Sequence, residues 1–322
     1  MTFVFFIAGF VLILKGADLL VSGASSIAAR YKIPELVVGL TIVSFGTSMP
    51  ELSVSILASL EGHTDLAIGN ILGSNIANIL LVLGVTAIIA PLPVKSTTVL
   101  SEIPFSLTAA LLVGFLANAA LFSPPTTALS LSRLDGVFLL FFLALFMGYI
   151  VKMTQSGYEA AGAEASQTPP SESLIRPIVY VLLGMTGLYL GGEWVVYGAI
   201  GIASKMGLSE SLVALTIVAI GTSLPELLTS AVAAYKKSTD IAIGNVVGSN
   251  IFNLLWVLGA SAVVTELPFD HISNTDLVMV IFSSALLLLA LEIGRKSVID
   301  RWKGVGFVCI YFSYLVYLVQ RG

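Results

Sequence analysis

A polar, glycine-rich pattern occurs twice in a chain that is otherwise strongly apolar. GTSMPE occupies residues 46–51, and GTSLPE occupies 221–226, 175 positions later. Each copy is followed at the same distance by a second block, DLAIGNILGSNIAN at 65–78 and DIAIGNVVGSNIFN at 240–253. Without gaps, 38–58 matches 213–233 at 13 of 21 positions, and 65–85 matches 240–260 at 14 of 21. The chain is therefore two copies of one unit, with equivalent polar residues in each.

The composition places both units in a membrane. Of 322 residues, 57% are hydrophobic and only 11% are charged, and the mean hydropathy is +1.00. A helix of about 20 apolar residues crosses the hydrocarbon core of a bilayer, and stretches of this length recur along the whole chain. We predict an all-α integral membrane protein with ten transmembrane helices. Their expected limits are 3–29, 36–60, 67–90, 103–122, 133–152, 176–203, 211–234, 242–265, 274–293 and 302–320.

Five helices in each unit predict an inverted repeat, because an odd number of crossings makes the second unit enter the membrane upside down. The first five-helix repeat covers 1–152 and the second covers 176–322. Residues 153–175 between them are small, polar and interrupted by proline, which is typical of a flexible cytoplasmic linker. With both termini extracytoplasmic, eleven Lys and Arg residues fall on the cytoplasmic side against three outside, as the positive-inside rule favours. We expect a multi-pass protein of the cell (plasma) membrane.

The first polar block predicts a cation site at membrane depth. Ser44, Thr47, Ser48 and Glu51 lie at i, i+3, i+4 and i+7, so a helix carries them on one stripe. Pro50 kinks that helix and frees main-chain carbonyls. A carboxylate within the membrane is costly and is usually functional. The equivalent residues of the second copy are Ala219, Thr222, Ser223 and Glu226.

The second block adds a stripe of Asn and Ser residues with i, i+4, i+8 spacing. Its members are Asn70, Ser74 and Asn78 in one copy and Asn245, Ser249 and Asn253 in the other. Carboxylate, hydroxyl and amide oxygens suit Ca²⁺ and Na⁺ rather than zinc or copper. Two carboxylates balance one Ca²⁺, so Na⁺ ions that occupy the same oxygens compete with it. Exchange then needs no chemical step.

These motifs resemble the paired α-repeats of the cation/calcium exchanger superfamily, and most closely its prokaryotic sodium/calcium exchanger branch. The resemblance covers essentially the whole chain. It implies a Ca²⁺ site at Thr47, Glu51, Thr222 and Glu226, with flanking Na⁺ sites and a lining in both copies. The residues implied there are Ser44, Ser48, Ser74 and Asn78 in the first copy and Ala219, Ser223, Ser249 and Asn253 in the second. It also implies that the first and sixth helices slide against the rest.

The expected function is secondary antiport of Na⁺ against Ca²⁺, with these ions and the lipid bilayer as the only partners and no cofactor, nucleic acid or obligate protein partner. Potassium-dependent members of the superfamily carry Asp at the position of Asn253, so K⁺ coupling is disfavoured here. An H⁺- or K⁺-coupled antiporter and a cation channel are the alternatives. Motifs of an intramembrane enzyme are absent from the sequence.

Other acids match between the copies. Asp18 and Glu193 occupy equivalent positions in the first helix of each repeat. Asp65 and Asp240 precede the third and eighth helices, where we expect them to act as N-caps.

Overall fold

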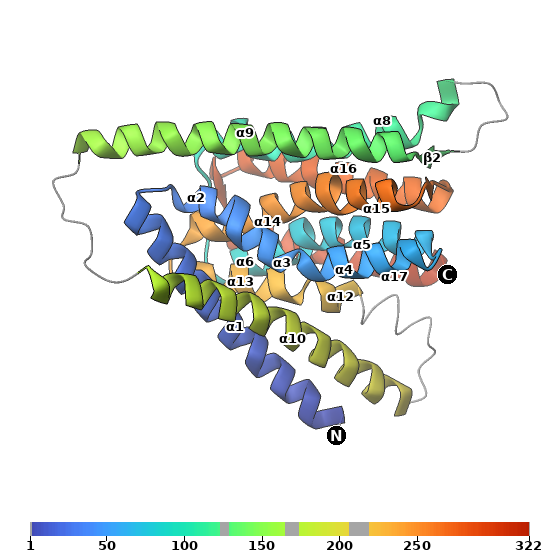
Figure 1. Ribbon diagram of the computed structural model, residues 1–322, viewed down its shortest axis with the longest axis horizontal. Coiled ribbons are helices and arrows are strands. Elements are labelled where there is room, and N and C mark those ends of the chain that lie inside the picture. The colour runs from blue at the N-terminus through green and yellow to red at the C-terminus, as the bar shows by residue number, and fades with distance from the viewer. Residues whose placement is uncertain (1, 123–128, 165–173, 206–218, 322) are drawn as a thin grey trace.

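The computed structural model describes residues 2–122, 129–164, 174–205 and 219–321, and most of them are helical (Figure 1). In this described part, eight helices are long and apolar enough to cross a membrane, and a ninth span forms if one bent pair is counted together. These correspond to nine of the ten predicted spans. The other, 211–234, is described only from Ala219.

The elements alternate between long helices and short connections. The first half contains α1 (Thr2–Tyr31), α2 (Glu35–Val38), η1 (Gly39–Val43), α3 (Ser44–Thr47), α4 (Met49–Leu60), α5 (Thr64–Ala77), η2 (Asn78–Leu83), α6 (Gly84–Ile89), β1 (Leu92–Pro93), α7 (Ser96–Leu100), α8 (Glu102–Ala117), η3 (Ala119–Phe122), β2 (Ser130–Leu131) and α9 (Arg133–Glu164). The second half contains α10 (Ile175–Lys205), α12 (Ala219–Thr222), α13 (Leu224–Tyr235), α14 (Thr239–Phe252), η5 (Asn253–Val257), α15 (Leu258–Val264), β3 (Leu267–Pro268), α16 (His271–Glu292), β4 (Val298–Ile299) and α17 (Arg301–Arg321).

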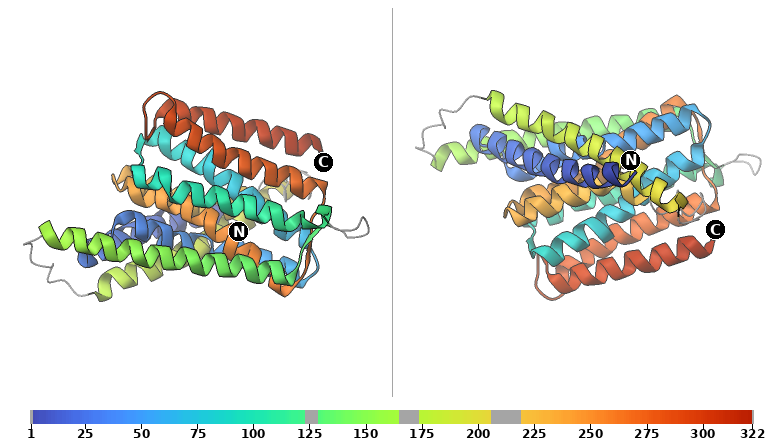
Figure 2. Two further views of the ribbon diagram at one scale, coloured as in Figure 1. Left: turned by 90° about the horizontal axis from the view of Figure 1, so that it is seen from above. Right: turned by 90° about the horizontal axis from the view of Figure 1, so that it is seen from below.

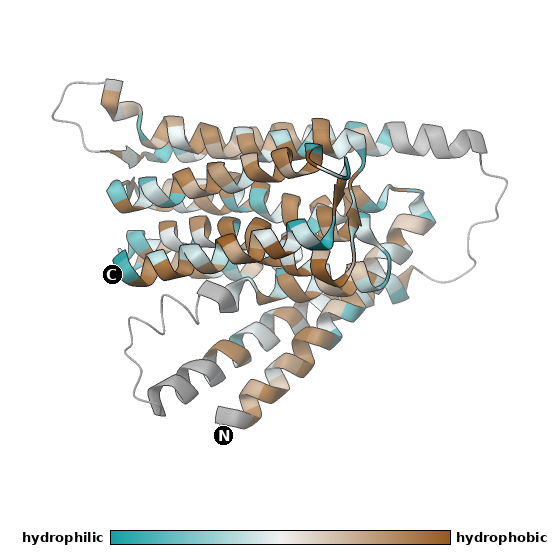
Figure 3. Ribbon diagram, turned by 180° about the vertical axis from the view of Figure 1, so that it is seen from behind, coloured by the Kyte–Doolittle hydropathy of each residue, from teal (hydrophilic) through white to brown (hydrophobic). Residues whose placement is uncertain are grey.

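The most buried helices are those that carry the polar blocks. In the most apolar stretch of α14 to α15, 94% of the residues are buried, and in that of α5 to α6 78% are buried, against 22% in α9 and in α17. Hydrophobic residues predominate along the outer helices, and hydrophilic residues gather towards the helix ends (Figure 3). The polar blocks therefore lie at the centre of the bundle, away from lipid.

Helices α1 and α10 form a pair that crosses the other helices obliquely (Figure 1). They pack against each other along their length through glycines. A Cβ added to Gly16 would lie 2.8 Å from the Leu188 backbone nitrogen, and one added to Gly184 would lie 2.6 Å from that of Leu20. Small residues of this kind let two membrane helices approach closely.

Two short antiparallel sheets each join one repeat to the other. β1 pairs with β4, where Leu92 faces Ile299, and β2 pairs with β3, where Leu131 faces Leu267. Beside β1, an ion pair of 2.6 Å connects Lys95 to Asp240. The helices other than α1 and α10 form a nearly parallel array in both views of Figure 2.

Two expectations about connections need correction. Helix α9 continues to Glu164, so the first part of the predicted 153–175 linker is helical, because its Ala and Glu residues favour helix. Residues 165–173 of that linker lie outside the described residues. Asp65 and Asp240 are not N-caps, because α5 and α14 begin one residue earlier, at Thr64 and Thr239. Both aspartates instead lie in the first helical turn, where the helix dipole favours an acid.

Candidate functional site

The two GTSxPE motifs form matching breaks in two helices. Between α3 and α4, Ser48 leaves the helical conformation (φ −85°, ψ 4°), and the two segments meet at 45°. Between α12 and α13, Ser223 adopts the same conformation (φ −87°, ψ 1°). In each case a proline occupies the first turn of the next helix, where its missing N–H costs nothing. The kink expected from Pro50 is confirmed.

Each break brings one glutamate to the middle of the protein. Glu51 lies in the first turn of α4 and Glu226 in the first turn of α13, and both are completely buried. The start of a helix carries partial positive charge, which favours a carboxylate there. The two carboxylates are close enough to interact electrostatically. The residues expected to anchor the site therefore converge.

The polar blocks of the two copies contact each other crosswise. Thr47 Oγ1 donates a hydrogen bond to Asn245 Oδ1 at 3.0 Å and lies 3.3 Å from Ser249 Oγ. In the mirrored contact, Thr222 Oγ1 donates to Asn70 Oδ1 at 3.3 Å. Each threonine thus contacts the second block of the other copy, so the site requires both halves.

Two asparagines fix the broken helices to their neighbours. Asn70 Nδ2 donates to Ser55 Oγ at 3.0 Å and to the Glu51 carbonyl at 3.5 Å. Asn245 Nδ2 donates to Ser230 Oγ at 2.9 Å and to the Glu226 carbonyl at 3.4 Å. Their amide groups are therefore used in positioning the glutamate-bearing turns. The i, i+4, i+8 pattern marked both asparagines without revealing this role.

Several buried oxygens at the site have no hydrogen-bond partner among the described residues. They include both carboxylate oxygens of Glu51 and one of Glu226, Oε2; its other, Oε1, accepts from Ser48 Oγ at 3.5 Å. The other predicted site residues with such atoms are Ser74, Asn78, Ser223 and Asn253. Buried polar atoms are normally paired, and unpaired ones cost free energy. A cation held by these oxygens would satisfy them.

The remaining predicted residues differ in how completely the structure describes them. Ser44 is buried, and its hydroxyl donates to the Thr41 carbonyl at 3.3 Å. Ala219 begins α12, but the surroundings of its side chain lie outside the described residues. No group of three or more His, Cys, Asp and Glu residues gathers in the described part of the chain, so the donor set consists of two carboxylates and neutral oxygens.

Helix α10 covers both breaks, a contact that the motifs alone did not predict. A Cβ added to Gly46 would lie 2.7 Å from Met185 Cε, and one added to Gly221 would lie 2.3 Å from Val196 Cγ2. The glycine of each GTSxPE motif therefore leaves room for one apolar side chain of α10. In the sequence, Gly46 and Gly221 were the residues that could have indicated close packing of another helix against the site.

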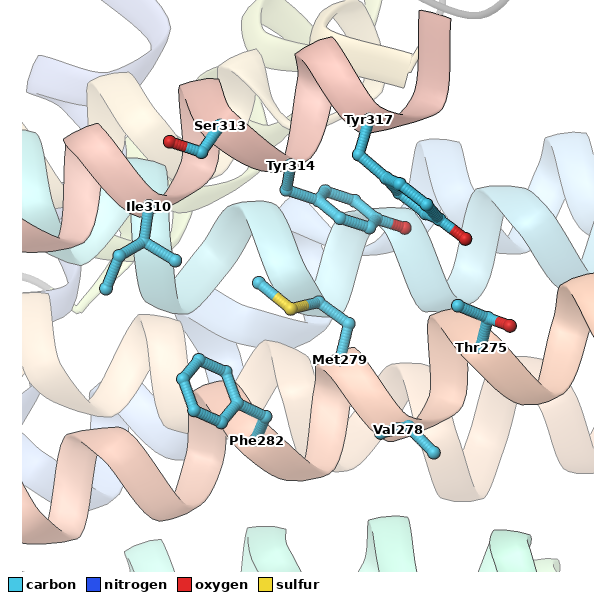
Figure 4. A pocket seen from close by; sticks show the side chains of 8 residues that line it. All are labelled: Thr275, Val278, Met279, Phe282, Ile310, Ser313, Tyr314 and Tyr317. Carbon is cyan, nitrogen blue, oxygen red and sulfur yellow. The ribbon is translucent and has the colours of Figure 1, made fainter. Parts of the chain in front are cut away.

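An apolar groove elsewhere contains none of the site residues. It lies between α16 and α17, where Tyr314 and Tyr317 stand opposite Thr275 and Met279 (Figure 4). Its lining contains no charged side chain.

Comparisons with known proteins identify relatives of the chain. The family described as sodium/calcium exchanger protein matches residues 1–152 and 176–320. The chain is 38% identical to a putative antiporter, CaxA, of Alkalimonas amylolytica, over 97% of this chain and 96% of that protein. It is 30% identical to the sodium/calcium exchanger MaX1 of Methanosarcina acetivorans, over 98% of both chains. A solved structure of the sodium-calcium exchanger NCX_Mj, soaked with Na⁺ and Ca²⁺, superposes with a TM-score of 0.80 at 31% identity, covering 98% of this chain and 97% of that chain.

Proposed function

The chain belongs to the sodium/calcium exchanger protein family, and we infer its function from that membership. It is a multi-pass membrane protein with the fold of a cation/Ca²⁺ exchanger. We propose that it is a secondary antiporter that exchanges Na⁺ for Ca²⁺ and extrudes Ca²⁺ from the cytoplasm. The observation that carries the proposal is the pair of fully buried glutamates, Glu51 and Glu226, with unpartnered oxygens facing a lining of neutral oxygens.

In the proposed Ca²⁺ site, Glu51 and Glu226 supply the two negative charges that balance the ion. Thr47 and Thr222 supply neutral oxygens, among them main-chain carbonyls of the kinked turns. The hydroxyls of Thr47 and Thr222 also cross-link the two copies, so the same residues keep the glutamates at a fixed separation. Hard oxygen ligands of this number and kind match what Ca²⁺ takes in proteins.

The proposed Na⁺ sites flank the Ca²⁺ site and share its glutamates. Their other donors are Ser44, Ser48, Ser74 and Asn78 on one side and Ala219, through its carbonyl, with Ser223, Ser249 and Asn253 on the other. Because the glutamates serve both ions, Na⁺ and Ca²⁺ exclude each other from the site. This competition couples an inward flow of Na⁺ to an outward flow of Ca²⁺.

Alternating access is assigned to the α1 and α10 pair. The glycine-lined contact between these helices supports movement as one body, and Met185 and Val196 of α10 lie over the two breaks. Sliding of the pair would expose the glutamates to one side of the membrane at a time. Residue 253 is Asn, where potassium-dependent members of the superfamily carry Asp, so Glu51 and Glu226 are the carboxylates of the proposed site. This difference favours Na⁺ over K⁺ as the coupling ion.

The proposed topology is an inverted repeat of two five-helix units. In support, the matched strands β1 (92–93) and β3 (267–268) do not pair with each other, and each pairs with a different partner, β4 or β2. The long helix pair α5 to α6 precedes β1, and α14 to α15 precedes β3. Charge bias favours a cytoplasmic location for the two connections that contain β1 and β4.

The proposal is tested by the flux of ⁴⁵Ca²⁺ into proteoliposomes loaded with Na⁺ and diluted into Na⁺-free buffer. Vesicles loaded with choline or K⁺, and vesicles given a pH jump, are the controls. Uptake that requires internal Na⁺ is expected. Uptake driven by the pH jump or by K⁺ would replace Na⁺ as the coupling ion, and uptake without any counter-ion would indicate a channel.

A further inference from the structure

Lys236 joins the α1 and α10 pair to the rest of the protein by three contacts. Its ammonium group lies 2.5 Å from Asp18 Oδ1, donates to the Asp18 carbonyl at 3.1 Å and donates to Ser22 Oγ at 2.7 Å. Asp18 and Ser22 belong to α1, whereas Lys236 is the C-terminal cap of α13, the helix that carries Glu226. One side chain thus links the proposed moving pair to a glutamate-bearing helix.

The packing around this link is not symmetric between the repeats. Helix α1 packs along α13, and Ser25 of α1 also approaches Ser238, 3.5 Å between hydroxyl oxygens. Across the described residues, the equivalent pair, α10 and α4, has no comparable packing. The α1 and α10 pair therefore lies against the core on the face that carries Lys236, and not on the face that carries the end of α4.

The charges at the equivalent positions differ in the same sense. Asp18 in α1 corresponds to Glu193 in α10, and Lys236 at the end of α13 corresponds to Glu61 at the end of α4. One repeat therefore offers an acid and a base where the pair meets the core. The other offers two acids, which would repel each other if α10 closed onto α4.

We propose that Asp18 and Lys236 form an ionic latch that holds α1 against α13 and closes the ion path on the face that carries Lys236. The inference rests on the alternating access of the proposed function. With Lys236 on the cytoplasmic side, the latch stabilises the state that is open to the outside. The position equivalent to Lys236 in the other repeat is Glu61, so the state that is open to the cytoplasm has no such latch. The resting equilibrium is therefore biased towards the state that is open to the outside.

The latch is reversible because it is only partly shielded from solvent. The side chain of Lys236 is 31% exposed and that of Asp18 is 50% exposed. Ion pairs with such exposure are weak and are screened by salt. Breaking this one, together with its two hydrogen bonds, is expected to raise the population of the unlatched state by about threefold to tenfold.

The test measures the position of α1 directly, without relying on transport. Spin labels are placed at Ser26→Cys in α1 and Thr97→Cys in α7, in a full-length protein whose only cysteine has been removed by Cys309→Ala, reconstituted in nanodiscs. The unlatched state should give a second inter-label distance. Lys236→Gln and Asp18→Asn are each expected to raise the population at that distance by about threefold to tenfold. The charge exchange Asp18→Lys with Lys236→Asp is expected to restore the original distribution.

Lys296→Gln is the matched control, because Lys296 also forms an exposed ion pair, with Glu292 at 3.6 Å, but one that does not involve α1. It should leave the distances unchanged, and a melting curve for each variant separates unlatching from unfolding. Glu61→Lys supplies the missing base on the other face, opposite Glu193. It should therefore stabilise the unlatched state and raise the population of the second distance, as Lys236→Gln does.

Distances in Lys236→Gln and Asp18→Asn that equal those of the unaltered protein would overturn the latch, and so would a shift in Lys296→Gln of the same size. A latch response in a protein that shows no Na⁺-dependent Ca²⁺ flux would contradict the proposed exchange reaction and leave the contact itself established. Side-specific Ca²⁺ affinities in proteoliposomes then show which face the latch closes.

Discussion

The two glutamates occupy equivalent positions but do not have identical surroundings. Glu226 Oε1 accepts a hydrogen bond from Ser48 at 3.5 Å, whereas neither carboxylate oxygen of Glu51 has a partner among the described residues. Ser48 belongs to the other copy, so the first repeat contributes a hydrogen bond to the glutamate of the second. Both carboxylates remain without an ionic partner from the described protein residues, as expected for groups that receive a cation from outside.

Glu51→Gln and Glu226→Gln are each expected to lower Ca²⁺ exchange by about 100-fold or more, because a close charge pair in a shielded site is worth several kcal/mol. Glutamine keeps the size of the side chain, so the helices should remain packed. The measurement is Na⁺-dependent ⁴⁵Ca²⁺ flux, with the melting temperature as the check on folding. Glu292→Gln, at the exposed end of α16, is the matched control, and unchanged flux in Glu51→Gln would remove the proposed site.

Much of the site was predictable from residue types, because the duplication identifies which polar residues belong together. Thr47, Ser48 and Glu51 were placed on one stripe, and the structure buries all three. The crosswise contact of Thr47 with Asn245 was not predictable, because it depends on how two distant helices are packed. The contact of Met185 with Gly46 was missed for the same reason.

At the scale of the helices, the kinks had a sequence signal and the π-helices did not. Proline in GTSxPE predicts a break, and Ser48 and Ser223 leave the helix as expected. The π-helical turns η2 and η5 begin at Asn78 and Asn253, two residues proposed to line the site. Such turns often occur at functional sites, but no residue type encodes them clearly.

Contact between α1 and α10 should be sensitive to any added side-chain volume. Gly16→Ala is expected to destabilise the protein by about 1–3 kcal/mol, because the new Cβ would meet the Leu188 backbone at 2.8 Å and backbone cannot move aside easily. Gly148→Ala in α9 is the control, because no described atom lies within 4 Å of its Cβ position. Thermal melting in detergent tests both variants. A melting temperature of Gly16→Ala equal to that of Gly148→Ala would show that α1 and α10 are not tightly packed.

Asp270 caps α16 and provides a pH-dependent contribution to stability. Its Oδ1 accepts a hydrogen bond from the Ser273 backbone N–H at 2.7 Å, and this bond is the main cause that lowers the pKa of Asp270 below its ordinary value of 3.8. A lowered folded-state pKa means that the stabilisation is present above 3.8 and is lost as the pH falls through the lower value.

Replacing this cap should therefore matter more at neutral pH than in acid. Asp270→Ala is expected to cost about 1 kcal/mol near pH 7, as loss of an N-cap usually does, and less once the pH falls below the lowered pKa of Asp270. The melting temperature of both proteins as a function of pH is the measurement. A difference that stays constant down to pH 2 would mean that the charge of Asp270 makes no contribution.

At the scale of the whole molecule, the topology predicts which loops face which side. In a Cys309→Ala background, His63→Cys should react with a membrane-impermeant maleimide in intact cells, whereas Ile293→Cys should react only in inverted vesicles. Both positions are exposed and lie in connections that the predicted topology places on opposite faces. Labelling of both from the same side would contradict the proposed arrangement.

Nine of the ten expected spans were predictable, because apolar length is a direct requirement of the bilayer. The oblique course of α1 and α10 was not, since nothing in the length of a helix determines its tilt. The extension of α9 to Glu164 was also missed, because the polar composition of that segment suggested a linker although its alanines favour helix.

The two small sheets also constrain how the protein is assembled during synthesis. β1 is made early, but its partner β4 is made only near the end of the chain, and β2 likewise waits for β3. The first repeat must therefore leave the ribosome and enter the bilayer with two unpaired strand edges. Closure of the bundle is therefore expected to be a late step, which waits for residues 267–268 to complete one sheet and for residues 298–299 to complete the other.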